Sequence, residues 1–206
     1  MICGMCACAG QSVENTAADA VAYLTKEDIT VNETISNDAD GEHAIEVSGE
    51  EASYSNTGVT KTGNADGDEA DFYGENSAVF ATEKGTLTIN DSLIETNGTH
   101  ANAVFSYGEG TTVNIANSVI ETQGDCSGGI MTTGGGTMNA ENLTINTSGR
   151  SSAAIRSDRG GGTVNVSKGY YKTTGMGSPV VYSTADITVS DAYMESTFAE
   201  VVCSWK

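Results

Sequence analysis

The chain has few basic residues, almost no proline and no long apolar segment. Among its 206 residues, one is proline, nine are lysine or arginine and 28 are acidic, which gives a formal net charge of −19. Such a surface repels phosphate backbones and anionic lipid, so nucleic acids and membrane surfaces are poor partners. No stretch is long enough to span a bilayer, so we expect no membrane insertion.

Cysteine is scarce outside the N-terminal segment. Cys3, Cys6 and Cys8 cluster at the start, while Cys126 and Cys203 stand alone. The first three could bind a metal, but no fourth ligand lies nearby. The segment Met5-Cys6-Ala7-Cys8 is similar to a lipoprotein cleavage box with Cys8 as the lipidated residue, although a basic n-region and a long apolar h-region are missing. We interpret residues 1–26 as a clipped leader and an N-terminal cap, in which residues 12–26 form a short helix or a first strand.

Apolar residues recur along the chain with a nearly constant period. One set repeats at steps of 25 or 26 residues, and a second set and a glycine set follow the same steps. The first set is Val79, Val104, Ile130, Ile155 and Val181; the second is Leu87, Val113, Met138 and Val164; the glycines are Gly98, Gly124, Gly149 and Gly175. A third apolar set is Ile94, Ile120, Ile145, Tyr171 and Met194. Such self-similarity is typical of a solenoid in which each repeat forms one coil.

Each period contains three short apolar segments separated by turn residues, which predicts three strands per coil. The fold class that follows is all-β, a right-handed parallel β-helix with coils of about 25 residues. We expect Gly98 and Gly124 to adopt positive φ at the turns. We also expect inward threonines at equivalent turn positions to form hydrogen-bonded stacks; they are Thr96, Thr122, Thr147 and Thr173.

The first coil is longer than the others. Ala52, Tyr54 and Val59 precede their equivalents by 35 residues, and an acidic insertion, Asn64 to Tyr73, carries the extra length. We assign residues 27–206 to one β-helix domain and expect it to be truncated at its C-terminus, because no capping pattern closes the sequence. The last coil should then expose core residues at Val189, Met194 and Val201. Open strand edges template pairing, so end-to-end self-association is expected.

Several segments resemble known β-helices. The runs NAVFSYGEGTTVNI, GGIMTTGGGTMNA and SAAIRSDRGGGTVNV resemble right-handed β-helices of the pectate-lyase-like superfamily. They resemble more narrowly the calcium-associated carbohydrate-binding and adhesin-like surface proteins of bacteria. The resemblance covers about residues 42 to 202. It implies a secreted or cell-surface protein, calcium sites, and a polysaccharide or a host or cell-surface glycan as partner.

Outward positions beside the first apolar set are the strongest candidates for ligand binding. They carry Phe80, Phe105, Met131, Arg156 and Tyr182, and an arginine inside so narrow a coil would be very costly. A ladder of exposed rings suits sugar binding, because flat rings bury the apolar faces of pyranoses. We therefore predict carbohydrate binding by Phe80, Phe105, Arg156 and Tyr182. The alternative is that Phe80 and Phe105 pack under the acidic insertion or stack on each other.

The acidic insertion contains carboxylates at nearly alternate positions. Asp66, Asp68 and Asp71 lie on a glycine-containing loop and could converge on calcium, which accepts flexible oxygen geometry. The EF-hand pattern is not met, because Glu69 stands where that loop requires glycine. The alternative is a solvated acidic loop.

Other functions have weaker support in the sequence. Outward Thr and Asn columns on a second face resemble the lattices of ice-binding solenoids, but such columns also suit strands without a ligand. A polysaccharide lyase would need carboxylates opposite an arginine, and no column presents them. His43 and His100 lie in expected loops, far apart in the repeat register. The sequence favours a non-catalytic polysaccharide-binding or adhesin-like module, with a structural surface stalk as the alternative.

Overall fold

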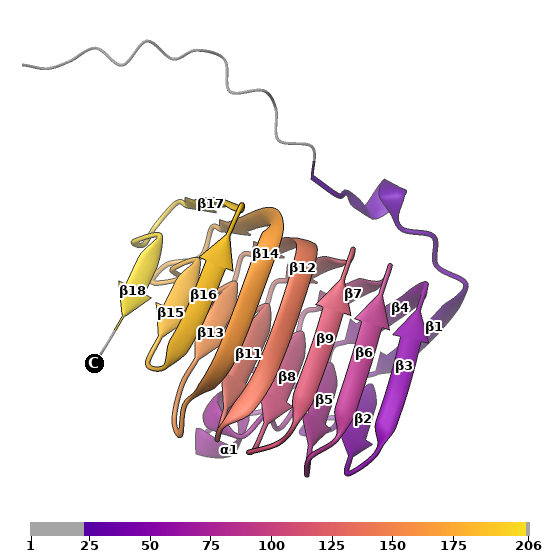
Figure 1. Cartoon of the computed structure of the whole chain (residues 1–206). Coiled ribbons are helices and arrows are strands. Elements are labelled where there is room, and N and C mark those ends of the chain that lie inside the picture. The colour runs from indigo at the N-terminus through magenta and orange to yellow at the C-terminus, as the bar shows by residue number, and fades with distance from the viewer. Residues whose placement is uncertain (1–22, 205–206) are drawn as a thin grey trace, which may run out of the picture.

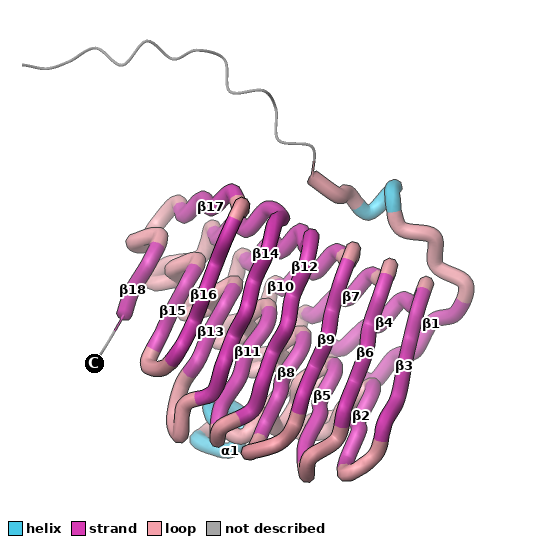
Figure 2. Tube along the Cα trace, in the orientation of Figure 1, coloured by secondary structure: helices cyan, strands magenta, loops and turns pink. Residues whose placement is uncertain are grey.

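The computed structural model describes residues 23–204 as one parallel β-solenoid (Figures 1 and 2). Strands on the near side of Figure 1 run upward and those behind them run downward as the chain advances from right to left, so the coils wind in a right-handed sense. Each coil has three faces. Residues 1–22, which include most of the predicted leader and cap with Cys3, Cys6 and Cys8, lie outside the described residues.

The first face is a seven-stranded parallel sheet. It consists of β2 (Ile45–Ser48), β5 (Val79–Thr82), β8 (Val104–Tyr107), β11 (Ile130–Thr133), β13 (Ile155–Ser157), β15 (Val181–Ser183) and β18 (Val202–Ser204). An 11-stranded sheet forms the other two faces, because β12 (Gly136–Thr147) and β14 (Gly162–Thr173) each run through both.

The remaining strands divide between the second and the third face. The second face adds β3 (Glu51–Ser55), β6 (Thr86–Asn90), β9 (Thr112–Ala116) and β16 (Asp186–Ser190). The third adds β1 (Glu33–Asn37), β4 (Thr57–Lys61), β7 (Leu93–Thr96), β10 (Val119–Thr122) and β17 (Tyr193–Ser196). Two short helices complete the described elements, the 3-10 helix η1 (Lys26–Asp28) and α1 (Asp68–Phe72). No helix in residues 23–204 is both long enough and apolar enough to cross a membrane.

The strand register confirms the repeat. Val79 pairs with Val104, Leu87 with Val113 and Ile94 with Ile120, and each column continues through later coils. Ala52 and Tyr54 pair with Leu87 and Ile89 at the predicted offset. The inward side chains of all three faces form one continuous apolar core, in which Leu87, Ile94 and Ile130 are fully buried. The alternation of inward apolar and outward polar residues therefore determines the fold.

The glycine column has a different role from the one predicted. Gly98, Gly124, Gly149 and Gly175 do not adopt positive φ, so that prediction was wrong. A Cβ at Gly149 would instead lie 1.8 Å from the carbonyl oxygen of Gly124, and one at Gly124 would lie 1.9 Å from the carbonyl of Gly98. The backbones of successive coils meet here with no room for a side chain. Glycine is therefore required for close approach.

Serine side chains bond the coils together beside this column. Ser152 Oγ accepts the N–H of Ser127 (3.0 Å) and lies 3.2 Å from the Gly124 carbonyl oxygen, to which it donates. Ser178 makes the equivalent pair of bonds with Ser152 (2.9 Å) and Gly149 (2.9 Å). The predicted threonine stack is buried but bonds differently. Thr147 and Thr173 donate to main-chain carbonyls of their own coils, whereas the hydroxyls of Thr96 and Thr122 are without a partner in the described part of the chain.

The described part of the predicted N-terminal cap lies along the third face. Tyr23 stacks on Tyr170 with ring centroids 4.4 Å apart, and Lys26 pairs with Glu95 and Glu121 on two successive coils. Lys26–Asp28 form a 3-10 turn. Of the segment 12–26, for which the sequence predicted a short helix or a first strand, residues 12–22 lie outside the described residues.

The last described coil is less buried than the coils before it. Val189 and Met194 are half-buried, and Val201 and Val202 are exposed, as the sequence predicted for Val201. The outer edges of β16, β17 and β18 pair with no further strand among residues 23–204. End-to-end self-association through these edges stays a prediction.

We predict that Gly149→Ala destabilises the solenoid by at least about 3 kcal/mol and lowers the melting temperature by roughly 6–12 °C. The new methyl group would meet the Gly124 carbonyl, which is backbone and cannot rotate away. Gly177→Ser is the matched control, because a Cβ there meets no atom within 4 Å and the equivalent position of the preceding coil is Ser151. Positive φ at Gly177 should limit that loss to about 1 kcal/mol. Equal melting temperatures for the two variants would show that the glycine column is not a steric requirement.

Candidate functional site

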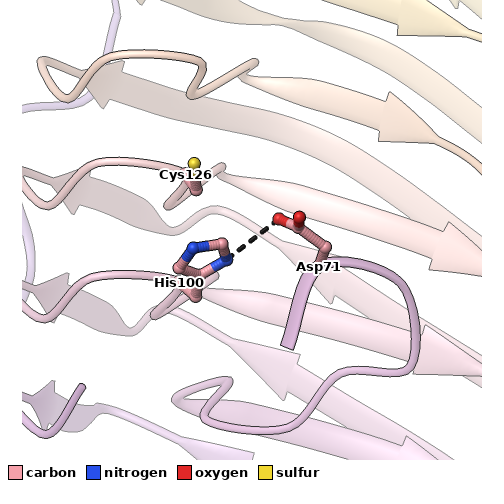
Figure 3. A group of neighbouring side chains, drawn as sticks. All are labelled: Asp71, His100 and Cys126. Carbon is pink, nitrogen blue, oxygen red and sulfur yellow. Dashed lines mark ion pairs between the residues drawn. The ribbon is translucent and has the colours of Figure 1, made fainter. Parts of the chain in front are cut away.

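The turn between the third and the first face presents one outward position in each coil. His100, Cys126, Ser151 and Gly177 occupy this position in successive coils, with φ of 54°, 54°, 54° and 66°. The N–H groups of His100 and Cys126 bond to carbonyls in the following coil, which keeps the turns in register. The left-handed backbone stacks the side chains of consecutive coils beside one another at the edge of the first face (Figure 3).

The acidic insertion folds back over the first face. In the sequence the insertion lies between β4 and β5. Even so, the Phe72 carbonyl accepts a 2.6 Å hydrogen bond from Thr133 on β11. Farther along, the Arg159 guanidinium lies 3.6 Å from the centroid of the Phe72 ring and donates to Asp68 at 2.7 Å. The insertion precedes β5 in the chain. It thus contacts the coils of β11 and β13, which lie two and three places after β5 in the first face.

Because of this path, two of the four predicted sugar-binding residues are covered. Phe80 is 7% exposed and Phe105 is fully buried, so the prediction that they form an exposed sugar-binding ladder was wrong. Both point outward from the solenoid core, but with Met131 and Tyr107 they form a second apolar cluster. The end of the insertion covers this cluster closely: the ring of Tyr73 lies 5.7 Å from that of Tyr107, and a Cβ at Gly74, the next residue, would lie 2.4 Å from the Phe80 ring. The alternative that these rings pack under the insertion is the one observed.

Arg156 and Tyr182, the other two predicted residues, remain accessible beside the insertion. Arg156 Nε and Nη2 both donate to Asp158 Oδ2, at 3.2 and 2.7 Å. The guanidinium carbon lies 5.6 Å from the Phe72 ring centroid and 5.7 Å from that of Tyr182, so it sits between two aromatic rings. Burial raises the pKa of the Tyr182 phenol, which therefore stays protonated at neutral pH.

A groove of about 340 Å³ joins these residues to the turn column. Its walls come from the insertion, from the turns and from the edge of the first face. The lining residues are Asp71, Cys126, Ser151, Ala153, Arg156, Gly177, Pro179 and Tyr182. The groove combines an aromatic ring, a cation, a carboxylate and a hydroxyl in one concave surface, which is the composition of a small-ligand site.

The structure does not bring the three predicted calcium ligands together. Asp68 pairs with Arg159, whereas Asp66 and Asp71 both face His100. The side chain of Asp66 is 99% exposed. Calcium prefers a shell of six to eight oxygen ligands. These carboxylates do not assemble such a shell, and calcium binding by Asp66, Asp68 and Asp71 stays a prediction that the geometry does not support.

Asp71 instead lies beside His100 and Cys126 (Figure 3), and Asp71 and Cys126 also line the groove. One ligand atom from each of these three side chains lies within 4.8 Å of the others. Asp71 Oδ1 is 2.9 Å from Nδ1 of His100, whose side chain is only 8% exposed. Burial, and next the negative charge of Asp71, raise the pKa of the Cys126 thiol. Within residues 23–204 this is the group of His, Cys and acidic side chains that is close enough to hold one metal ion.

The sequence contained part of the signal for this cluster. His100 and Cys126 are 26 residues apart, which is one coil, so they occupy the same position in consecutive turns. His100 was compared only with His43, from which it is far apart in the repeat register, and this relation was therefore missed. Asp71 carries no such signal, because the insertion lies outside the repeat and its path depends on tertiary contacts.

The second face offers a cavity but no unsatisfied amides. A depression of about 390 Å³ follows the asparagine column at the edge of that face. Asn139 donates to Asn114 at 2.9 Å, and Asn165 donates to Asn139 at 3.0 Å. The amides satisfy one another between coils, as expected for a stacked ladder without a ligand. The groove beside the insertion is therefore the better candidate site.

We predict that Arg159→Ala loosens the insertion without unfolding the solenoid. The substitution removes the contact with the Phe72 ring and the ion pair with Asp68, so amide exchange in residues 68–73 should speed up several-fold. Exchange in the strands of the core should stay unchanged. Arg150→Ala is the matched control, since Arg150 is exposed and its side chain makes no ion pair in the described residues. Equal exchange rates in both variants would show that Arg159 does not hold the insertion.

Comparisons with protein-family models, with curated proteins and with solved structures found no match to this chain. The parallel β-solenoid therefore stands on the register and the repeat, and membership of the pectate-lyase-like superfamily has no support beyond the resemblance. The function has to be argued from the geometry of the groove and of the side chains around it.

Proposed function

We propose that this protein is a non-catalytic, extracellular β-helix module that binds polysaccharide in the groove beside the insertion. The observation that carries the proposal is that Tyr182 lies next to a fixed Arg156 and that both line the same groove as the Asp71 carboxylate. A half-exposed ring can bury the apolar face of a sugar, while charged and hydroxyl groups around it bind the sugar hydroxyls.

Arg156 is held in place before any ligand arrives. Its bonds to Asp158 and its contacts with the rings of Phe72 and Tyr182 restrict the side chain, so ordering it costs little entropy on binding. Two of the five donors of the guanidinium are used by Asp158, which leaves others for sugar hydroxyls. Preorganisation of this kind favours affinity.

The charge of the chain narrows the class of sugar. A net charge of −19 disfavours polyanionic polymers such as uronic-acid chains, whereas neutral and amino sugars meet no such repulsion. The groove volume of about 340 Å³ lies at the lower end of the range for small-ligand sites, which suits a short segment or the end of a chain.

Two features support a binding role over catalysis. Arg156 is paired with Asp158, so it is a poor general base for a lyase reaction. The raised pKa of the Cys126 thiol opposes a reactive thiolate at neutral pH.

A structural surface stalk is the second candidate. The burial of Phe80 and Phe105 favours it, because it removes two rings from the surface that a long polysaccharide would follow. In a stalk the groove would have no ligand, and the stacked coils would serve only as a spacer. Binding measurements separate the two functions.

We predict that the full chain binds neutral or amino-sugar polysaccharides on a glycan array and in pull-down with insoluble polymers. Tyr182→Ala should weaken binding at least about tenfold, or about 1.4 kcal/mol, because it removes the ring that stacks on the sugar. Tyr193→Ala is the matched control, since Tyr193 is 45% exposed on the third face and stacks on Tyr170 at 5.2 Å.

Melting temperatures of both variants should be measured to exclude unfolding as the cause. No binding to any glycan, with or without added calcium, would contradict the proposal and favour the stalk. Equal losses in Tyr182→Ala and Tyr193→Ala would place binding outside the groove.

A further inference from the structure

His100 has a buried nitrogen with no hydrogen-bond partner. Its side chain is more than nine-tenths buried, and Nδ1 makes no hydrogen bond in the described part of the chain. Asp71 Oδ1 lies 2.9 Å away, but the direction of approach does not meet hydrogen-bond geometry. Leaving a buried polar atom without a hydrogen bond destabilises the folded state by about 1–3 kcal/mol. A binding partner for this nitrogen is therefore expected.

The neighbouring side chains favour a cation as that partner. A ring nitrogen of His100, an oxygen of Asp71 and the sulfur of Cys126 all lie within 4.8 Å of one another. Bond lengths of about 2.0–2.3 Å would place these atoms roughly 3.3–3.6 Å apart around a tetrahedral ion. Small side-chain movements would therefore bring the three ligand atoms from their observed spacing to the spacing of a metal site.

The Asp66 carboxylate lies near the other ring nitrogen of His100 without bonding to it. Its Oδ1 lies 3.7 Å from Nε2 of His100, on the far side of the ring from Asp71. This distance is longer than a hydrogen bond and the Asp66 side chain is 99% exposed, so Asp66 is not counted as a ligand and the site rests on the other three residues.

We propose that Asp71, His100 and Cys126 form a binding site for Zn²⁺ or a similar borderline divalent metal ion. Imidazole, thiolate and carboxylate together suit zinc, whereas calcium and magnesium prefer shells of oxygen only. Three protein ligands leave a fourth coordination position open. Because Asp71 and Cys126 also line the groove, the proposed site adjoins it. The site does not depend on sugar binding.

Metal binding would join the insertion to two coils of the solenoid. Asp71 comes from the α1 segment, whereas His100 and Cys126 come from consecutive turns. A bound ion would therefore fix the insertion over the apolar cluster of Phe80, Phe105 and Met131. Apo Cys126 has a raised thiol pKa, and a bound cation reverses that effect by stabilising the thiolate.

Titration of the full chain with Co²⁺ alone, followed by displacement with Zn²⁺, tests the site. Cys3, Cys6 and Cys8 are replaced by Ser in all proteins, because these thiols could bind the metal themselves. We expect one equivalent of Co²⁺ with the visible absorption of tetrahedral coordination and a thiolate-to-cobalt charge-transfer band. Excess Zn²⁺ should abolish both signals.

Three variants and two controls assign the ligands. Cys126→Ser should abolish the charge-transfer band, and this variant should fold because Ser151 occupies the same position one coil later. His100→Gln and Asp71→Asn should each weaken Co²⁺ binding by more than the roughly 10–100-fold that loss of an outer-shell partner costs. His43→Gln and Cys203→Ser, which remove the other histidine and the other remaining thiol, should leave binding unchanged.

No stoichiometric Co²⁺ or Zn²⁺ binding in the background protein would overturn the proposal and leave an ion pair between His100 and Asp71. Binding that survives both Cys126→Ser and His100→Gln would overturn it as well. Circular dichroism of each variant shows whether a loss of binding reflects unfolding. Glycan binding is measured on the same proteins, so failure of the metal site and failure of the sugar site are distinguishable.

Discussion

The close approach of backbones in successive coils is the constraint on which the rest of this structure depends. At the glycine column a carbonyl of one coil occupies the space that a side chain of the next would need. Ser127, Ser152 and Ser178 then bond across the same boundary. Since each coil is too small to bury its own apolar residues, stability arises from these repeated interfaces. The fixed spacing also places equivalent side chains directly beside one another.

Because of this stacking, turn residues that are one coil apart in the sequence come together as a site. A residue at the turn position is unremarkable in one coil, but His100 and Cys126 become neighbours because their coils stack in register. The insertion adds what the repeat cannot supply. It breaks the period, crosses the first face, covers Phe80 and Phe105, and brings Asp71 to the same turn positions. The groove and the cluster both lie where the irregular segment meets the regular stack.

The sequence predicted the parts of the structure that the repeat governs. The three faces, the columns of Val79, Leu87 and Ile94, and the offset caused by the insertion all follow from period-two alternation and a constant coil length. Predictions outside the repeat were less successful. Phe80 and Phe105 point outward as predicted, but the tertiary path of the insertion buries them. Gly98 and Gly124 were assigned to positive φ, whereas the residues two positions later in the same turns, His100 and Cys126, adopt it.

The groove and the cluster together support one hypothesis about function. An aromatic ring and a fixed arginine line a groove, and Asp71 and Cys126 of the His-Cys-Asp cluster line it as well. The most direct test is anomalous diffraction at the zinc absorption edge from crystals of the full chain grown with Zn²⁺. The account predicts an anomalous peak bounded by Asp71, His100 and Cys126, with the insertion ordered over Phe80. No peak among these three residues, with zinc bound elsewhere or not at all, would contradict it.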